Sequence, residues 1–160
     1  LADSLERELP ELHRQGVRLR HIGRLEGLST KLRSKVEAAM ELTKDNDTLD
    51  ICIAWNYGGR DEIVYAVQEI LKSGLKPEEI DEQVISNHLF TAEVPDPDLV
   101  VRTSGEYRTS NFLLYQSAYA EWVFPKVYWP DFGREEFHKA LLEFGSRERR
   151  FGKTSAQLEK

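Results

Sequence analysis

Apolar residues recur along the chain with the period of helices in some segments and of strands in others. Helical spacing, bounded by Gly, Ser or Pro signals, predicts helices over residues 1–15, 29–42, 60–71, 77–89, 111–119 and 134–146. Short alternating or β-branched runs predict strands over residues 17–22, 49–55, 98–101 and 122–128. Because strands and helices alternate, the predicted fold class is α/β, with a mainly parallel sheet flanked by helices.

The predicted sheet has few strands for a fold that covers both faces of a sheet with helices. The chain also opens on Leu1, without a methionine, and its helical pattern begins there. We therefore expect the fold to be incomplete at its N-terminus.

The composition is that of a globular protein with one hydrophobic core, since 40% of the 160 residues are hydrophobic. The 22 basic and 28 acidic residues give a net charge of −6, which argues against a nucleic-acid partner but allows a local basic pocket. A single cysteine, Cys52, excludes an intrachain disulfide and favours a reducing, cytoplasmic location. No apolar run reaches the roughly 18–20 residues of a membrane span.

The loop after the predicted strand 98–101 carries most of the candidate chemistry. Arg102 and Arg108 offer planar guanidinium groups whose donors match phosphate oxygens. Ser110, at the start of a predicted helix, would add a hydroxyl, backbone N–H groups and a positive dipole end. The loop therefore predicts a site for a phosphorylated ligand. The residues leave an alternative open, in which an arginine pairs with Glu106 and Ser110 is a plain helix cap.

Two further features bear on a ligand site. Glu106 and Glu121 can bind Mg²⁺, which prefers carboxylate oxygens together with substrate phosphates, although a solvated acid or an arginine partner is the favoured interpretation of each. The loop at residues 56–60 (NYGGR) can bring backbone close to a ligand, although a tight turn is favoured there. Ligands of open parallel sheets bind at the carboxyl ends of strands, so this loop and the one after residue 101 are expected along one rim.

Segments in a fixed order resemble conserved segments of the cis-prenyltransferases, the undecaprenyl diphosphate synthase family. They read VRLRHIG, IAWNYGGRDEI, DLVVRTSGEYRTSNFLLYQSAYAEWVF, VYWPDF and RERRFG. The resemblance identifies residues 1–152 as the C-terminal part of a single domain of this family, with 153–160 as a flexible tail. It implies a transferase that condenses isopentenyl diphosphate onto an allylic prenyl diphosphate with Z geometry. Diphosphate is released, and the products are polyprenyl diphosphates that serve as lipid carriers.

The resemblance also implies roles for particular residues. The diphosphate of isopentenyl diphosphate would be bound by Arg102, Arg108, Thr109 and Ser110. Glu121 would help to hold Mg²⁺, the implied cofactor, and Ile51 would line an apolar tunnel for the growing chain. Cations would offset the repulsion between two diphosphates, and a polyprenyl tail needs a dry apolar cavity. The resemblance also implies a homodimer, with its interface near residues 122–132 and the basic segment at residues 147–150. It further implies a product that can associate with a membrane.

The chain departs from the family pattern in two places. Tyr107 stands where some relatives have a histidine that assists the metal. The Asp-Gly-Asn-Gly-Arg-type motif, which supplies the family's catalytic aspartate, does not occur in the 160 residues, so we assign no catalytic residue and expect this chain alone to be inactive. The alternative function is a non-catalytic homologous subunit of a heteromeric enzyme. We favour a truncated catalytic chain, because the NYGGR loop and Arg102, Arg108 and Ser110 are retained.

Overall fold

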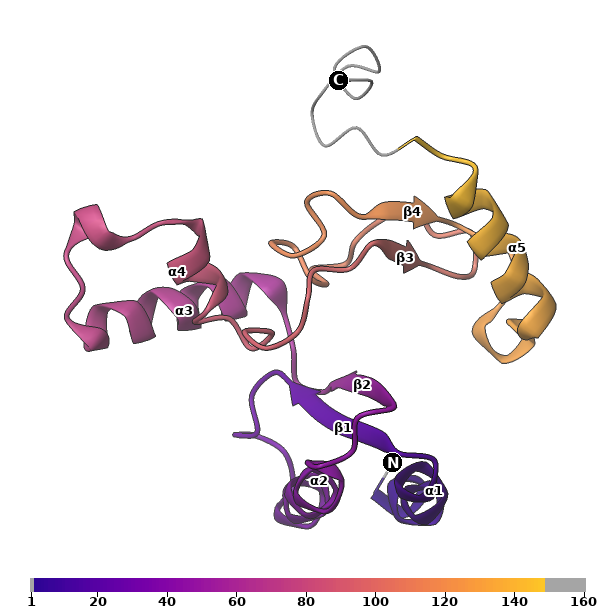
Figure 1. Ribbon diagram of the computed structural model, residues 1–160, viewed down its shortest axis with the longest axis horizontal. Coiled ribbons are helices and arrows are strands. Elements are labelled where there is room, and N and C mark those ends of the chain that lie inside the picture. Colours follow the sequence, from indigo (N-terminus) through magenta and orange to yellow (C-terminus); the bar gives the residue numbers. More distant parts are fainter. Residues whose placement is uncertain (1, 149–160) are drawn as a thin grey trace. The chain divides into compact units, whose positions relative to one another are not determined.

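The computed structural model describes residues 2–148 and confirms an α/β fold with parallel strands flanked by helices (Figure 1). The chain divides into two compact units between Glu93 and Val94. The first unit contains α1 (Ala2–Arg14), β1 (Val17–Ile22), α2 (Thr30–Thr43), β2 (Leu49–Ala54), α3 (Gly59–Ser73) and α4 (Glu82–Ser86). The second contains β3 (Leu99–Val101), β4 (Glu121–Val123) and α5 (Arg134–Gly145). The tail expected at 153–160 and residues 149–152 of the RERRFG segment lie outside the described residues.

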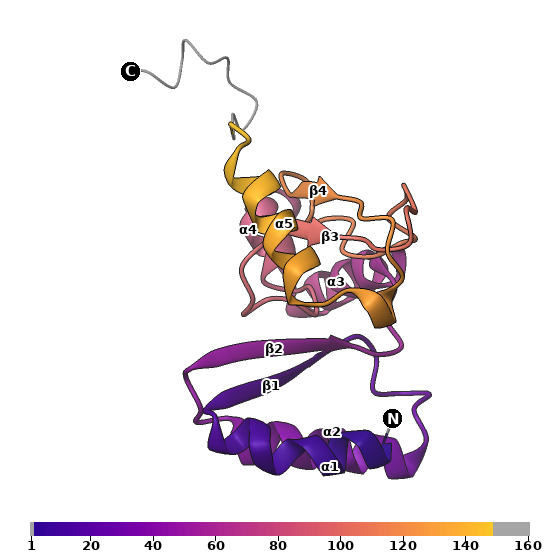
Figure 2. The same ribbon diagram turned by 90° about the vertical axis from the view of Figure 1, so that its right-hand side faces the viewer.

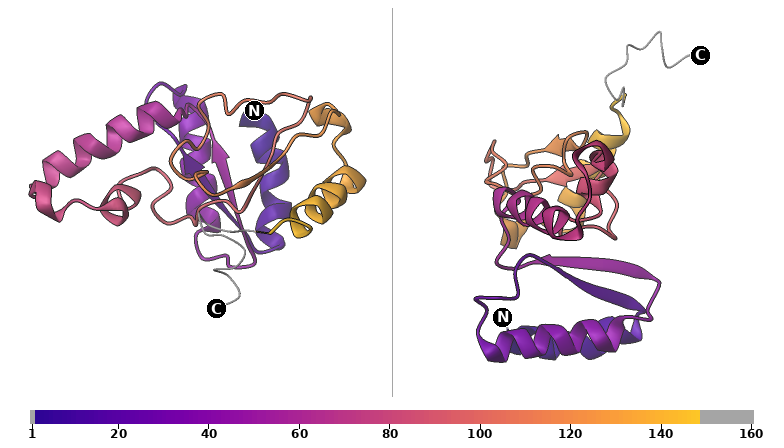
Figure 3. Two further views of the ribbon diagram at one scale, coloured as in Figure 1. Left: turned by 90° about the horizontal axis from the view of Figure 1, so that it is seen from above. Right: turned by 90° about the vertical axis from the view of Figure 1, so that its left-hand side faces the viewer.

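The first unit is built on the parallel pair β1–β2, in register from Val17 opposite Leu49 to Ile22 opposite Ala54. Helices α1 and α2 lie side by side on one face of this pair (Figures 2 and 3). Alternate residues of the strands point to this face and pack against the leucines of α1, whose helical spacing predicted this helix. The resulting core cluster contains Val17, Leu19 and Ala39, with Leu5, Leu9, Leu12, Ile51 and Ile53 packed against it.

The other face of β1 is basic, and its charges are paired. Arg18 donates from Nε and Nη2 to the two carboxylate oxygens of Asp50 at 2.5 and 2.7 Å. Arg20 pairs with Asp50 at 3.3 Å and with Glu93 at 2.7 Å. The apolar-basic alternation of VRLRHI therefore separates a core face from a face of ion pairs, as the strand period requires.

The helix expected over residues 77–89 is interrupted. A 3₁₀ turn covers Pro77–Glu79, and α4 begins only at Glu82. Between them Ile80 is extended, and the Asp81 carboxylate accepts a hydrogen bond from Val84 N at 2.8 Å as the cap of α4. An aspartate that caps a new helix cannot also lie in the interior of a longer one.

The second unit is built on the parallel pair β3–β4, with Leu99 opposite Glu121 and Val101 opposite Val123. Backbone pairing continues beyond the strands, because Arg102 N and Ser104 N donate to the carbonyls of Val123 and Val127 at 2.9 and 2.8 Å. Strand β4 ends at Val123, earlier than the predicted 122–128, where the chain meets Pro125. Helix α5 packs against β4.

The helix expected over residues 111–119 is absent, and this expectation was wrong. Residues 110–119 form a series of turns and bends. Ser110, Asn111 and Leu113 have φ values of 49°, 64° and 45°, in the left-handed region that no α-helix can contain. The Ser-Asn pair resembles a helix cap in sequence, but here its short polar residues accept a left-handed turn.

No helix within residues 2–148 is both long enough and apolar enough to cross a membrane. The NYGGR loop belongs to the first unit and the loop after β3 to the second, so their placement along one rim stays a prediction.

Candidate functional site

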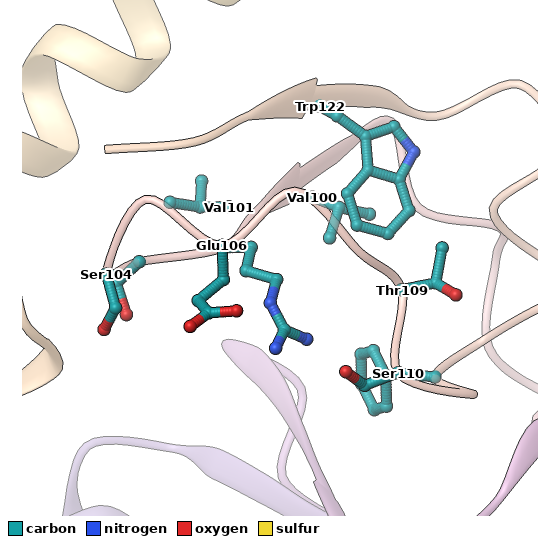
Figure 4. A pocket seen from close by; sticks show the side chains of 10 residues that line it. Val100, Val101, Ser104, Glu106, Thr109, Ser110 and Trp122 are labelled. Atoms are coloured by element: carbon teal, nitrogen blue, oxygen red, sulfur yellow. The ribbon is translucent and has the colours of Figure 1, made fainter. Parts of the chain in front are cut away.

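The second unit contains a cavity of about 450 Å³ at the carboxyl end of β3. Its walls come from the end of β3, from the loop that follows and from β4. They are formed by Val100, Val101, Arg102, Thr103, Ser104, Glu106, Thr109, Ser110, Phe112 and Trp122 (Figure 4). The cavity thus combines one basic side chain, one acidic side chain (Glu106) and several hydroxyls with an apolar floor, in the size range of small-molecule sites.

Arg102 is the central candidate for binding an anion. Its backbone is fixed, because its N–H donates to Val123 O at 2.9 Å. Its side chain lines the cavity and is half-buried, and within residues 2–148 its guanidinium has neither an ion pair nor a side-chain hydrogen bond. Many other arginines of the described chain are paired with a carboxylate, such as Arg18 and Arg24. A half-buried guanidinium with unused donors in a cavity is suited to an incoming anion.

Of the other three residues predicted to bind the diphosphate, two line the cavity and one does not. Thr109 and Ser110 line the cavity together with Arg102, and Figure 4 shows them on the loop that faces Trp122 of β4. Arg108 is not among the lining residues; its side chain is 63% exposed and pairs with Glu106. The salt bridge to Glu106 that sequence reasoning left open therefore exists for Arg108, and none is formed by Arg102 in the described part of the chain.

The helix-dipole contribution expected at Ser110 is absent, since no helix begins there. Two backbone N–H groups of the loop, those of Ser104 and Gly105, are already used in pairing with Val127 O and Pro125 O. The side-chain donors that line the cavity are the Arg102 guanidinium and the hydroxyls of the loop.

Glu121 lies at the start of β4 but does not line the cavity. Successive strand residues point to opposite faces, so the ring of Trp122 reaches the cavity and the carboxylate of Glu121 does not. Its Oε2 accepts a hydrogen bond from Arg147 Nη1 at 2.8 Å. Hydrogen bonds to Glu121 and then to Glu143 raise the pKa of Arg147 above its ordinary value.

The described residues do not by themselves fit a protein-built metal centre. Within residues 2–148, no three His, Cys, Asp or Glu side chains are grouped so that they could hold an ion. Glu121 is engaged with Arg147, and Glu106 with Arg108. The assignment of Mg²⁺ to Glu121 stays a prediction from the family resemblance.

Ile51, expected to line a tunnel, lies in β2 and packs partly buried against the core cluster of Val17, Leu19 and Ala39. A nearby cavity beneath α2, lined in part by Leu19 and Ile53, has a volume of only about 10 Å³. The tunnel role of Ile51 is untested by these contacts and stays a prediction.

Sequence reasoning missed a second organised region, around the NYGGR loop of the first unit. Asn56 has a φ of 51°, and its side-chain N–H groups donate to the carbonyls of Arg24 and Glu26 at 3.1 and 2.7 Å. The Arg24 guanidinium in turn holds both oxygens of Asp61, at 2.6 and 3.1 Å, and lies over the ring of Tyr65. That pairing lowers the pKa of Asp61.

Glu62 anchors the same loop from within. Its side chain is fully buried, and its two oxygens accept from Tyr57 Oη at 2.6 Å and from Phe90 N at 2.9 Å. Helix α3 buries Glu62, Ala66 and Ile70, and leaves the aliphatic residues Val64 and Leu71 exposed. The signal available in the sequence was the spacing of Glu62, Ala66 and Ile70, which places all three on one face of a helix.

Three comparisons place the chain among known proteins. Residues 1–152 match the family model described as "Putative undecaprenyl diphosphate synthase". An isoprenyl transferase of Heliobacterium mobile is 50% identical over 157 residues, which cover 95% of this chain and 60% of that protein. An isoprenyl transferase of Agrobacterium fabrum is 46% identical over 158 residues, which cover 96% and 64%. The chain thus spans less than two thirds of the length of these curated relatives.

Solved structures agree with the sequence matches. Lavandulyl diphosphate synthase from Lavandula x intermedia, in complex with dimethylallyl diphosphate, matches with a TM-score of 0.90 at 32% identity, over 95% of this chain and 68% of that one. A "probable undecaprenyl diphosphate synthase" from Campylobacter jejuni matches with a TM-score of 0.86 at 36% identity, over 94% and 70%.

Proposed function

This chain belongs to the undecaprenyl diphosphate synthase family of prenyltransferases, and we propose that it serves the condensation of isopentenyl diphosphate with an allylic prenyl diphosphate. The reaction would release diphosphate and create a Z double bond in a polyprenyl product. The cavity at the end of β3 would receive the diphosphate of isopentenyl diphosphate. The names of the relatives support prenyl transfer, and the choice of donor and acceptor is our proposal.

The observation that carries this proposal is the guanidinium of Arg102 in the cavity wall, which has no ion pair or side-chain hydrogen bond within residues 2–148. A diphosphate is a multiply charged anion, and its transfer from water into a half-buried cavity needs fixed positive charge and hydrogen-bond donors. Arg102 supplies the charge, and the hydroxyls of Thr109 and Ser110 lie in the same wall. The apolar floor, including Val100 and Trp122, suits the short isoprenyl group attached to that diphosphate.

Arg108 would act differently from Arg102. Because it is largely exposed and paired with Glu106, it must turn from that carboxylate to reach a diphosphate in the cavity. We therefore assign Arg102 the larger share of the binding energy and Arg108 a supporting role.

Magnesium is part of the proposal only through the family. Mg²⁺ is commonly bound by one or two carboxylates together with substrate phosphates and water, and it would neutralise diphosphate charge. Glu121 is the residue that would supply a carboxylate. The described residues do not by themselves form a site for the ion.

The family's catalytic aspartate would lie in a longer form of this chain, and the 160 residues alone would give no product. The second candidate, a non-catalytic partner subunit, is less well supported, because such a subunit has no need of the Arg102 cavity. Mixing the purified 160-residue chain with farnesyl diphosphate, isopentenyl diphosphate and Mg²⁺ tests the first statement. Product formation by this chain alone would refute it.

Arg102→Ala in a complete, active form of the protein tests the assigned site. The substitution removes a charge-assisted contact of about 1.5–3 kcal/mol, so we expect the KM for isopentenyl diphosphate to rise about 10- to 100-fold. Arg33→Ala is the matched control, because Arg33 is exposed on α2 and pairs only within its own helix, with Glu37. An unchanged KM and kcat in Arg102→Ala would show that the assignment is wrong.

A further inference from the structure

Arg147 lies just beyond the end of α5 and joins that helix to β4. Its Nη1 donates to Glu121 Oε2 at 2.8 Å and to the carbonyl of Trp122 at 3.0 Å. Its Nη2 pairs with Glu143 on α5. The side chain is 32% exposed, so one partly buried guanidinium holds the first two residues of β4.

The second of these residues, Trp122, lines the cavity described above, whereas Glu121 does not. The ring of Trp122 forms the wall opposite Thr109 and Ser110 (Figure 4). The next residue, Val123, accepts the backbone hydrogen bond of Arg102 at 2.9 Å. Three consecutive residues of β4 therefore connect Arg147 to the cavity wall and to the backbone of Arg102.

The β3–β4 pair depends on such a tie because it is short. Each strand has three residues, and a two-stranded pair of this length has little stability of its own. Hydrogen bonds from a charged donor are roughly twice as strong as neutral ones. The contacts of Arg147 thus fix a segment that the sheet alone would hold weakly.

We propose that Arg147 is a positioning residue for the diphosphate cavity, and that it acts through Glu121 and the backbone of Trp122. The inference rests on the proposed function of that cavity. This positioning role of Arg147 differs from a plain helix-end role, in which the basic side chain would only offset the dipole of α5 and pair with Glu143. A helix-end role needs Glu143, whereas the positioning role needs Glu121 and Trp122.

The test measures the dissociation constant for inorganic diphosphate by calorimetry, on the complete protein, with folding checked by circular dichroism. For Arg147→Ala we expect about tenfold weaker binding at a temperature where the variant is fully folded. Arg147→Lys keeps a cation with N–H donors but loses the planar guanidinium that spans Glu121, Trp122 O and Glu143, so it should recover part of the loss. Glu143→Ala, which removes only the partner on α5, should bind within twofold of the unaltered protein.

The outcomes separate this inference from the proposed function. If Arg147→Ala lowers the melting temperature but leaves the diphosphate dissociation constant unchanged, Arg147 is a structural tie only and the inference is overturned. If Glu143→Ala weakens binding as much as Arg147→Ala, the helix-end role is the correct one. If neither the unaltered protein nor Arg102→Ala binds diphosphate, the proposed function fails and the inference fails with it.

Discussion

At the scale of single residues, the most consequential buried side chain of the first unit is Glu62. A buried carboxylate is unfavourable unless its oxygens accept hydrogen bonds. Glu62 meets this condition by accepting from Tyr57 Oη and Phe90 N, which ties the loop before α3 to the segment after α4. Its role is therefore to hold two loops together, and its removal leaves both donors without this acceptor.

We expect Glu62→Ala to lower the free energy of unfolding by about 2–4 kcal/mol, since it removes a buried carboxylate and leaves two half-buried donors without this acceptor. Tyr57→Phe removes only one donor and should cost about 1 kcal/mol. Urea unfolding measures both. Glu41→Ala is the control, because Glu41 is exposed and its ion pair within residues 2–148 is with Lys44, the residue just after α2. It should change the unfolding free energy by less than about 0.5 kcal/mol. Equal effects of Glu62→Ala and Glu41→Ala would contradict the role given to Glu62.

The sequence predicted the residues of the cavity better than those of the Glu62 region. Arg102, Thr109 and Ser110 follow an apolar strand in one continuous stretch, so a local pattern brings them together. Glu62 and Phe90 are distant in the chain, and only the fold places them in contact. The exclusion of Arg108 and Glu121 from the cavity depends on which way each side chain points, which strand and loop geometry decides.

At the scale of elements, helices and strands with a clear period were predicted within a few residues, and loops rich in Ser and Asn were not. Helix α1 follows from its leucines and β1 from its alternation. The segment after Ser110 has apolar residues at helical spacing. It still forms no helix, because Ser110, Asn111 and Leu113 have left-handed backbone conformations. Sequence composition does not reveal which of two turn geometries such residues will take.

The loops that follow β1 and β2 are pressed against each other, and Gly23 makes this possible. Its φ is 117°, and a Cβ built there would lie 2.4 Å from Trp55 O. Arg24 N, in the next residue, donates to Asn56 O at 3.1 Å. A side chain at Gly23 would therefore separate the loop after β1 from the NYGGR loop.

We expect Gly23→Ala to cost about 2–4 kcal/mol of unfolding free energy, from backbone strain together with the contact to Trp55 O. Gly74→Ala separates the two causes, because Gly74 also has a positive φ, 77°, but nothing lies within 4 Å of the added Cβ. It should cost only about 1–2 kcal/mol. Thermal and urea unfolding of both variants give the comparison, and a larger loss in Gly74→Ala would show that the close approach is not limiting.

At the scale of the whole molecule, acid should weaken the first unit through its ion pairs. Hydrogen bonds from Arg18, Arg24 and Arg20 lower the pKa values of Asp50, Asp61 and Glu93, respectively. A pKa that is lower in the folded than in the unfolded state stabilises the fold above the unfolded value, near pH 4. This contribution is lost as the pH falls from there through the folded pKa.

We expect the urea midpoint to be steady from about pH 7 to 5 and to fall below about pH 4. Asp61→Asn removes one contributor and leaves Arg24 without its carboxylate, so the variant should be slightly less stable than the unaltered protein at pH 7. The two should converge as the pH falls below the lowered pKa of Asp61, where this residue is protonated in both the folded and the unfolded state. A difference that stays constant throughout the acid range would mean that Asp61 stabilises the fold by packing and not by charge.

Large aromatic and aliphatic side chains are exposed on the second unit, and we propose that they form the interface of the homodimer implied by the family. Tyr128 and Trp129 are 68% and 72% exposed, and Leu142 on α5 is 63% exposed. The aromatic pair lies within the stretch 122–132 that sequence reasoning placed near the interface. A twofold interface buries the same patch on both subunits, so one substitution removes two contacts at once.

We therefore expect Trp129→Glu to convert the complete protein from dimer to monomer at micromolar concentration, because a carboxylate would have to be buried twice in one interface. Light scattering coupled to size-exclusion chromatography measures the mass directly. Leu42→Glu is the matched control, since Leu42 is 49% exposed on α2 of the first unit, and it should leave the mass unchanged. If the unaltered protein is already a monomer, the homodimer is wrong. If Trp129→Glu remains a dimer, the interface lies on another face.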